Sequence, residues 1–294
     1  MRTDQAVALR KMVGETVERI PSGSVQQYVP QRAIAITSGK GGVGKSNISL
    51  NLSLALTRLK KQICLFDADL GLANVDVLLG VHPQYNIQHV LSGEKTISEI
   101  MLEVSGGLKV ISGGSGIDKL ANLDLITQEL LLRSFHRLDQ DFDILLIDTG
   151  AGISRQVTNF VLAANEVIVI LTPEPTSLTD AYAMIKFITI RSAMTKIQIL
   201  VNMAKNEEEG MEIFSKIEMI VRRFLGKEIS YLGSLLMDNE LKQAVRHQIP
   251  VIQVAPRSLF AAGINQVAKK ICGMIVSPPQ ASYFSRLFGF CKKS

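Results

Sequence analysis

The sequence has few cysteines, no signal-peptide pattern and no histidine cluster. Its three cysteines form no CxxC pair, and its first ten residues lack the apolar core of a signal peptide. The four histidines show no metal-ligand spacing. We therefore expect a chain suited to a reducing cytoplasm, with neither a disulfide framework nor a zinc site.

Long apolar runs and a strong charge imbalance are also missing. The longest apolar stretches, such as ILLI at 144 to 147 and VIVIL at 167 to 171, are far shorter than the roughly 20 residues of a membrane-spanning helix. Lys and Arg exceed Asp and Glu by 32 to 27. This small excess permits attraction to an anionic surface, but it cannot choose between lipid, nucleic acid and nucleotide.

The chain divides into three expected parts. Residues 1–30 are polar and end in a linker-like PSGSVQQYVP, and 31–276 hold the regular patterns of one large domain. SPPQ at 277 to 280 interrupts the helical pattern because proline cannot continue a helix comfortably. Residues 277–294 are therefore expected to form a separate C-terminal segment.

Short apolar runs alternate with longer helical patterns across the domain. The predicted strands are 33–37, 62–67, 108–112, 143–148, 166–172 and 197–202, and the predicted helices are 45–60, 176–193, 208–225, 238–247 and 257–275. The strands are continuously apolar, which indicates that both of their faces are covered. We predict an α/β fold with a doubly wound, mainly parallel sheet and helices on both faces.

A glycine-rich loop follows the first predicted strand and precedes a helical pattern. Gly39, Gly44, Lys45 and Ser46 satisfy G-x-x-x-x-G-K-[ST] in that context. Backbone N–H groups of such a loop surround phosphate oxygens, the lysine reaches the phosphates and the serine hydroxyl binds Mg²⁺. The expected phosphate-binding residues are Gly39, Lys40, Gly41, Gly42, Val43, Gly44, Lys45, Ser46 and Asn47.

Acidic residues follow two of the predicted strands. Asp67 and Asp69 end the second strand and Asp148 ends the fourth, so all three should lie at one edge of the sheet. Carboxylate oxygens beside a triphosphate suit Mg²⁺ and its retained waters. We expect a magnesium and nucleotide site at this edge.

The stretch KGGVGKS at 40 to 46 resembles the deviant Walker A motif of the MinD/ParA/nitrogenase-iron-protein group. The resemblance implies a P-loop ATPase with ATP or ADP and Mg²⁺ as cofactors, and a homodimer when ATP is bound. It implies that Lys40 crosses the dimer interface to the other subunit's phosphates; a solvated loop lysine is the alternative. The resemblance further implies that Lys40, Lys45 and Asp69 act in catalysis, that Ser46, Asp67 and Asp148 bind Mg²⁺, and that Asn202 contacts adenine.

The N-terminal tail carries DQAVALR, in which Asp4, Gln5, Ala6, Leu9 and Arg10 match a DQAxxLR pattern. This resembles the flagellar-number regulators of the FlhG (FleN, YlxH) type, which engage and stimulate the SRP-type GTPase FlhF. The resemblance also implies a flagellar transcriptional activator and switch-complex proteins as further possible partners. From the residues alone we find only a short helix-prone peptide able to lie in a groove, and an ordinary polar tail is the alternative.

The C-terminal segment has an amphipathic pattern. In a helix, its apolar side chains would form one stripe, namely Tyr283, Phe284, Leu287, Phe288 and Cys291. Nearby lysines suit anionic lipid headgroups, so we expect reversible binding at the cytoplasmic face of the inner membrane, strengthened in an ATP-bound dimer. The alternative is a terminal helix packed on the domain's own core.

Other function classes share the nucleotide site. A ParA-like DNA-partitioning ATPase would bind DNA in a salt-sensitive way, and a MinD-like cell-division regulator would lack the N-terminal motif. An electron-transfer protein needs cysteines for an iron–sulfur cluster, which the spacing of Cys64, Cys272 and Cys291 does not favour. We expect the flagellar regulator, without direct specific DNA binding.

Overall fold

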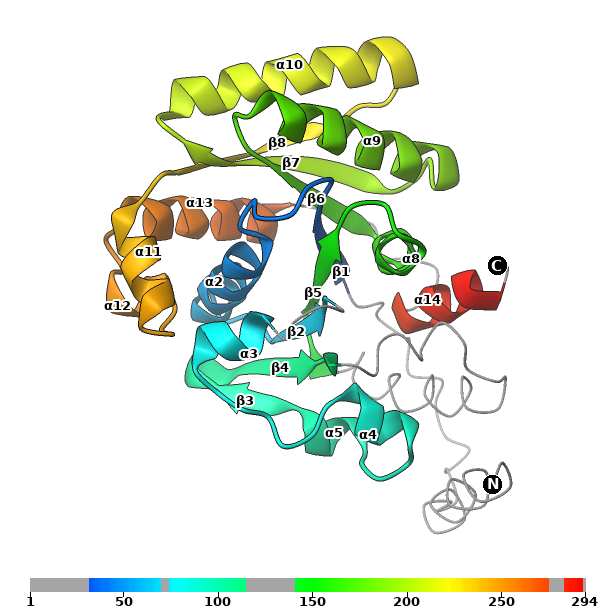
Figure 1. The fold of residues 1–294 in the computed structure, drawn as a ribbon, viewed down its shortest axis with the longest axis vertical. Helices are drawn as coiled ribbons and strands as arrows, with labels where there is room; N and C mark the ends of the chain where they lie inside the picture. The colour runs from blue at the N-terminus through cyan, green and yellow to red at the C-terminus, as the bar shows by residue number, and fades with distance from the viewer. Residues whose placement is uncertain (1–31, 70–73, 115–140, 275–282, 293–294) are drawn as a thin grey trace.

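A computed structural model of the chain describes residues 32–69, 74–114, 141–274 and 283–292. Its centre is an eight-stranded sheet in the order β3-β4-β2-β5-β1-β6-β7-β8 (Figure 1). The strands are β1 (Arg32–Ser38), β2 (Ile63–Ala68), β3 (Leu102–Val104), β4 (Leu108–Ser112), β5 (Ile144–Ala151), β6 (Glu166–Leu171), β7 (Lys196–Ala204) and β8 (Ser230–Leu236). All neighbouring strands are parallel except β3 and β4. The predicted mainly parallel sheet is confirmed.

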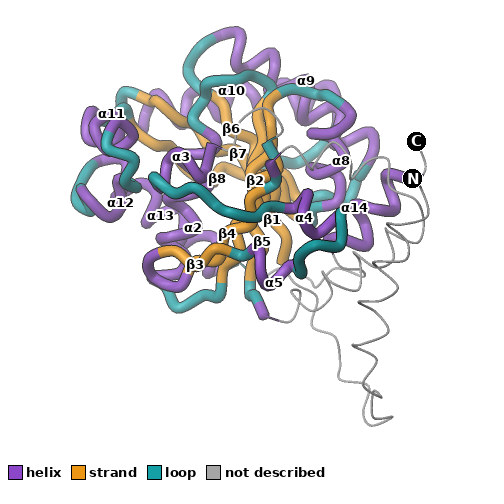
Figure 2. Tube along the Cα trace, turned by 60° about the horizontal axis from the view of Figure 1, so that its bottom comes forward, coloured by secondary structure: helices purple, strands orange, loops and turns teal. Residues whose placement is uncertain are grey.

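Helices cover both faces of the sheet, as Figure 2 shows from a second direction. One face carries α2 (Lys45–Arg58), α3 (Asn74–Leu79), α11 (Asn239–Arg246), α12 (Val251–Val254) and α13 (Leu259–Gly273). The other carries α4 (Ile87–Leu91), α5 (Ile97–Ile100), α8 (Arg155–Ala163), α9 (Pro175–Arg191), α10 (Glu207–Leu225) and α14 (Tyr283–Lys292). The short turn η1 (Ser105–Gly107) joins β3 to β4. Two separate apolar cores result.

The strands are apolar throughout because successive side chains enter opposite cores. In β1, Ala33 and Ala35 face the core under α8 and α9, while Ile34 and Ile36 face the core under α2 and α13. All four are at most 1% exposed. A strand buried on both sides has no polar face, which is why continuous rather than alternating hydrophobicity predicted this sheet.

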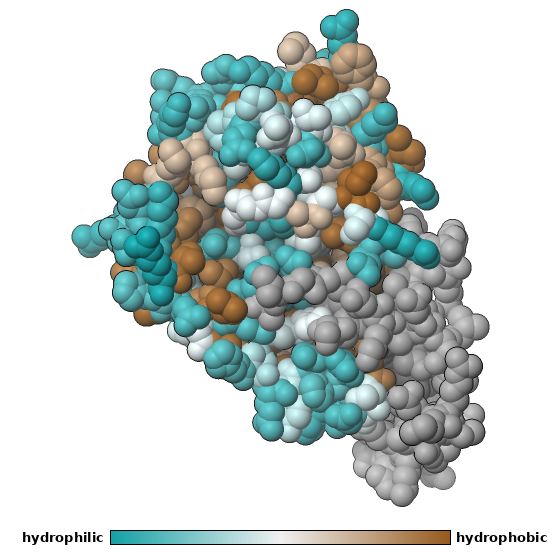
Figure 3. Space-filling view, in the orientation of Figure 1, coloured by the Kyte–Doolittle hydropathy of each residue, from teal (hydrophilic) through white to brown (hydrophobic). Residues whose placement is uncertain are grey.

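Helix α10 shows how local signals set an outer element. The Asn206 side chain accepts a 2.8 Å hydrogen bond from Glu209 N, and Gly226 with φ 58° ends the helix. Its outer side leaves Met219 and Phe224 about two-thirds exposed. Exposed apolar side chains lie over the C-terminal ends of α9 and α10, at the upper right in Figure 3. Nothing in the structure assigns a partner to them.

The C-terminal helix differs from the main expectation. Its apolar stripe is buried against the domain, since Tyr283, Phe284, Leu287 and Phe288 are at most 2% exposed. The rings of Phe284 and Phe66 are 6.3 Å apart. The structure therefore has the alternative arrangement, in which the helix packs on the domain's own core, and membrane binding by the stripe stays a prediction.

Polar contacts also anchor α14. The Tyr283 hydroxyl donates to the carbonyl of Phe160 on α8 at 3.3 Å, and Arg286 Nη2 donates to Asn165 Oδ1 at 2.9 Å. The stripe fits because β2 and α8 present an apolar surface that would otherwise face water. The Cys291 side chain and the tail motif at 4–10 lie outside the described residues. In the described ranges, no helix combines the length and apolar character that crossing a membrane requires.

Candidate functional site

The glycine-rich loop connects β1 to α2, as predicted. Gly42 and Gly44 have φ of 77° and 90°, which side chains rarely adopt. Gly39 is required for a different reason, because a Cβ there would lie 2.1 Å from the backbone oxygen of Asp180 in α9. The loop is thus folded by local torsions and seated against α9 by close packing.

Gly39→Ala is expected to destabilise the protein by roughly 1–3 kcal/mol or more, because overpacking against backbone cannot be relieved by a side-chain rotation. Gly41→Ala is the matched control, since a Cβ at Gly41 meets no atom within 4 Å. Thermal unfolding of both variants without nucleotide measures the difference. Equal melting temperatures would show that the loop does not sit against Asp180 as described.

Lys45 is the first residue of α2 and is only 7% exposed. Its Nζ donates to the Ser38 hydroxyl at 3.1 Å, and that hydroxyl donates to the carbonyl of Lys40 at 2.6 Å. Burial lowers the pKa of Lys45, while Asp148 and Asp69 oppose the shift. Ser38 was not predicted, although it directly precedes the loop. A buried, pre-positioned cation of this kind suits a phosphate ligand.

The two strand-end carboxylates are brought together by the sheet register. Asp67 on β2 is paired with Asp148 on β5. Burial raises the pKa of Asp67 to about 8, helped by Asp148, and burial raises the pKa of Asp148 to about 6 against nearby hydroxyls and Lys45. The Ser49 hydroxyl donates to Asp148 Oδ1 at 2.9 Å. Two anions in one buried place are unfavourable without a cation.

Asp148 also carries the observation that tests a magnesium site. Its Oδ2 is buried and has no hydrogen-bond partner among the described residues, and the Ser46 hydroxyl lies beside the same carboxylate. In the described part of the chain, no three His, Cys, Asp or Glu side chains could hold a metal by themselves. The Asp148 carboxylate and the Ser46 hydroxyl are oxygen ligands of the kind that Mg²⁺ takes together with phosphate oxygens and retained waters. Ser46, Asp67 and Asp148 would hold it, and the ion would neutralise phosphate charge.

Asp69 lies at the same edge and is half-buried. Its backbone N–H donates to Asp67 Oδ1 at 3.2 Å, and Asn74 Nδ2 donates to Asp69 Oδ2 at 3.1 Å. Asn74, at the start of α3, was not predicted as a site residue. These contacts orient a carboxylate close to Lys45, where it can accept a proton or hydrogen bond from water.

Lys40 is turned toward α9 of its own chain. Its Nζ is 2.6 Å from Glu174 Oε2 and 3.3 Å from Thr176 Oγ1, and its side chain is 41% exposed. An exposed ion pair of this type contributes little, about 0–1 kcal/mol. The Lys40 ammonium can therefore leave Glu174 at little cost in free energy and bind a more strongly charged anion. Glu174 and Thr176 were not predicted.

Asn202 is brought beside the loop, as the predicted site requires. It is 2% exposed, and its Nδ2 donates to the carbonyl of Val43 at 2.8 Å. The next residue, Met203, has φ 60° at an irregularity in the pairing of β7 with β8. The amide therefore fastens β7 to the loop in this conformation, and its role toward adenine stays a prediction.

The sequence and the fold also resemble those of known proteins. The ParA family, described as NUBPL iron-transfer P-loop NTPase, matches residues 30–272. The antiactivator FleN of Pseudomonas aeruginosa is 40% identical over 242 residues, covering 82% of this chain and 86% of FleN. The chain belongs to the ParA family of P-loop NTPases. It is an ATPase of that family, and the predicted resemblance is confirmed.

Two further relatives extend this assignment. The flagellum site-determining protein YlxH of Helicobacter pylori is 35% identical over 272 residues, covering 87% of this chain and 90% of YlxH. The fold matches the MinD cell division protein of Aquifex aeolicus with a TM-score of 0.66 at 24% identity, over 85% of this chain and all of that one. It also matches MinD of Pyrococcus horikoshii complexed with Mg-ADP, with a TM-score of 0.67 at 22% identity, over 83% and 96%.

Proposed function

We propose that this ATPase is a nucleotide-controlled dimer that regulates the number or placement of flagella. YlxH, which is 35% identical to it, is named a flagellum site-determining protein, and FleN, which is 40% identical, is named an antiactivator. Mg·ATP and Mg·ADP are the ligands that the P-loop and its carboxylates suit, and a relative in fold is a complex with Mg-ADP. The observation that carries the dimer is the placement of Lys40.

The Lys40 ammonium could bind a phosphate, but in this structure it forms an exposed ion pair with Glu174 of its own chain. Lys45 already places one buried cation at the loop, whereas Lys40 reaches outward to Glu174. Releasing an exposed ion pair costs about 1 kcal/mol at most. A second subunit facing this loop could receive the Lys40 ammonium at its γ-phosphate, where developing charge needs neutralisation. ATP would then hold the two subunits together.

Lys40→Ala is therefore expected to abolish ATP-induced dimerisation while changing ATP affinity less than about threefold, because Lys45 keeps the phosphate contact. Sedimentation velocity with Mg·ATP and with Mg·ADP measures the association. Lys269→Ala is a matched control that removes one exposed lysine from α13. A Lys40→Ala protein that dimerises normally in ATP would remove this lysine from the interface.

The partner proposed for the N-terminal tail is the SRP-type GTPase FlhF. The support is the DQAVALR sequence itself, since residues 1–31 lie outside the described structure. Gln5 would orient the attacking water in the partner, as glutamines do in other GTPase systems. A flagellar transcriptional activator and switch-complex proteins are proposed as additional partners.

A peptide of residues 1–20 is expected to raise GTP turnover by FlhF at least severalfold, and the same peptide with Gln5→Ala should lose the effect. Phosphate release under multiple turnover measures both. Equal stimulation by the two peptides would exclude Gln5 from the role. Full stimulation by a protein that lacks residues 1–20 would place the contact elsewhere.

Reversible membrane association is proposed for α14, with the protein otherwise in the cytoplasm. Because its stripe is buried on the domain, lipid binding requires the helix to leave β2 and α8 first. Such a step lowers the apparent affinity by the fraction of molecules with a released helix. Two released helices in one ATP-bound dimer would bind far more tightly than one, through effective concentration.

A further inference from the structure

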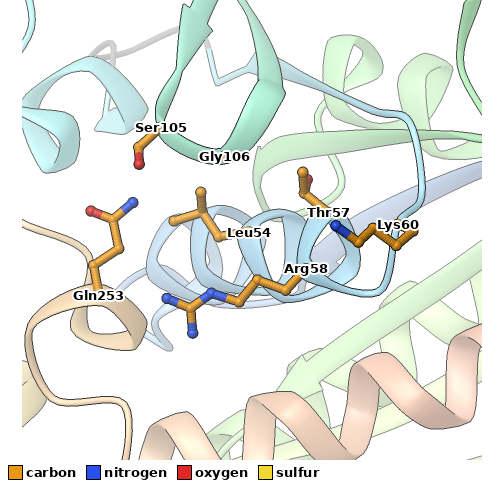
Figure 4. Close-up of a pocket in the computed structure, with 7 residues that line it drawn as sticks. All are labelled: Leu54, Thr57, Arg58, Lys60, Ser105, Gly106 and Gln253. Carbon is orange, nitrogen blue, oxygen red and sulfur yellow. The ribbon is translucent and has the colours of Figure 1, made fainter.

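A hollow of about 330 Å³ lies at the end of α2 that is remote from the glycine-rich loop (Figure 4). Its lining residues come from α2, η1, α12 and the turn after α2, and they are Leu54, Thr57, Arg58, Lys60, Ser105, Gly106 and Gln253. Figure 4 shows the polar ends of Ser105, Gln253 and Arg58 around Leu54. The site described above uses none of these residues.

The lining combines two cations with neutral hydrogen-bonding groups and contains no acid. Arg58 Nη2 donates to the carbonyl of Ile252 at 2.9 Å, which fixes the guanidinium against α12 and leaves its other N–H donors available. Among the described residues, neither Arg58 nor Lys60 forms an ion pair. No described residue thus neutralises the charge of the hollow.

Backbone features hold the hollow open. Gly106 and Gly107 have φ of 83° and 84°, so β3 turns tightly into β4 and brings Ser105 over α2. Lys60, two residues beyond the end of α2, has φ 64°, and its N–H donates to the Thr57 carbonyl at 2.9 Å. Backbone N–H groups after α2 therefore satisfy the carbonyls of Ala55, Leu56 and Thr57, and the Lys60 ammonium is not needed to cap these three.

The charge of the chain is uneven, and the hollow borders its basic part. Residues 241–274, which include most of α11 and all of α12 and α13 on the face that carries α2, contain five Lys and Arg and no Asp or Glu, whereas residues 1–240 contain 24 Lys and Arg against 27 Asp and Glu. Gln253 and the Ile252 carbonyl belong to this acid-free stretch. A positive field around a concave site raises the local concentration of anions.

We propose that this hollow binds a phosphate-bearing anion. A guanidinium presents paired N–H donors to phosphate oxygens, an ammonium adds a mobile point charge, and the Ser105 hydroxyl and Gln253 amide can donate further bonds. The volume lies at the small end of ligand pockets, which suits a small phosphate-bearing molecule or a single headgroup rather than an extended strand. The group can belong to an anionic lipid headgroup or to a soluble phosphate compound. The proposal does not depend on the dimer or on α14.

The test uses the full chain saturated with Mg·ADP, so that the glycine-rich loop is occupied. Arg58→Gln/Lys60→Gln removes both charges of the hollow, and Lys242→Gln/Arg246→Gln removes two exposed charges from α11 as the matched control. One arm compares melting temperatures in inorganic phosphate and in chloride at equal ionic strength. The other measures co-sedimentation with vesicles of phosphatidylcholine, with and without phosphatidylglycerol.

A free phosphate ligand is expected to raise the melting temperature of the wild type by roughly 2 °C, with the rise lost in the hollow variant and kept in the control. A lipid ligand is expected to leave that arm flat, while the hollow variant binds anionic vesicles roughly tenfold more weakly. If the wild type does not bind vesicles but is stabilised by phosphate, membrane association of α14 is excluded and anion binding by the hollow is supported.

Several results would overturn the assignment. Equal responses of the hollow variant and the control pair in both arms would mean that only overall charge matters. No response of the wild type in either arm would mean that the hollow does not bind phosphate groups. A third arm measures binding of duplex DNA by the same proteins; DNA binding that only the hollow variant loses, without a response to phosphate or vesicles, would make this surface a nucleic-acid contact instead.

Discussion

Lys45→Ala is expected to weaken ATP binding roughly 10- to 100-fold, because each lost hydrogen bond between charged groups contributes about 1.5–3 kcal/mol. Lys45 is nearly fully buried and is already positioned by Ser38, so little side-chain ordering remains to be done when phosphate binds. Removing a buried charge also removes its desolvation cost, and Asp148, which loses a nearby cation, can take up a proton instead of staying charged. The nucleotide-free variant should therefore melt no more than a few degrees from the wild type. Isothermal titration with Mg·ATP measures the affinity.

Asp69→Asn is the companion variant that separates binding from catalysis. The amide keeps an oxygen for the hydrogen bond from Asn74 but cannot take a proton from water. ATP hydrolysis is expected to fall 10²- to 10⁴-fold, with ATP affinity nearly unchanged. Normal hydrolysis by Asp69→Asn would exclude it as the residue that orients water. Normal ATP binding by Lys45→Ala would contradict the phosphate site itself.

The parts of this site that lie close together in sequence could be predicted from it. The loop at 39–47 carries its own geometry, because its glycine torsions and its position between a strand and a helix are local properties. Asp67 and Asp148 could also be placed, since parallel strands bring their carboxyl ends to one edge and the register pairs these two residues. Both strands were recognisable because burial on two faces leaves no polar alternation.

Contacts between distant segments could not be predicted in this way. Glu174 holds Lys40 across 134 residues of chain, and no spacing rule connects them. Short helices such as α8 and the edge strand β3 give too few residues for a periodic pattern. The surroundings of α14 were ambiguous for a chemical reason. A stripe of aromatic and aliphatic side chains is satisfied equally by lipid and by a protein core.

Phe284→Glu is expected to release α14 from the domain and to abolish vesicle binding in every nucleotide state. Phe284 is 2% exposed and lies against the ring of Phe66, so a carboxylate cannot remain there without a large desolvation cost. Losing this packing should lower stability by roughly 3 kcal/mol, which thermal unfolding measures. Vesicle binding is lost for a separate reason, because the new charge stands in the middle of the stripe that would meet lipid.

Tyr283→Phe is the matched variant that loosens the docking without harming the stripe. It removes only the hydroxyl that donates to the Phe160 carbonyl, a bond that contributes about 1 kcal/mol, and it keeps the ring. If release of α14 limits membrane binding, the released fraction rises by roughly fivefold, and apparent affinity for anionic vesicles in ADP rises with it. Co-sedimentation with vesicles in ADP and in ATP measures this.

Together, the two variants test whether the buried apolar stripe of α14 also binds lipid. Opposite effects, with Tyr283→Phe strengthening and Phe284→Glu abolishing vesicle binding, require that the residues packing α14 on the domain also contact lipid. If Tyr283→Phe lowers stability slightly and leaves vesicle binding unchanged, docking does not compete with the membrane. If Phe284→Glu also binds vesicles like the wild type, α14 is only a structural part of the core, since a glutamate within the stripe could not enter lipid at so small a cost.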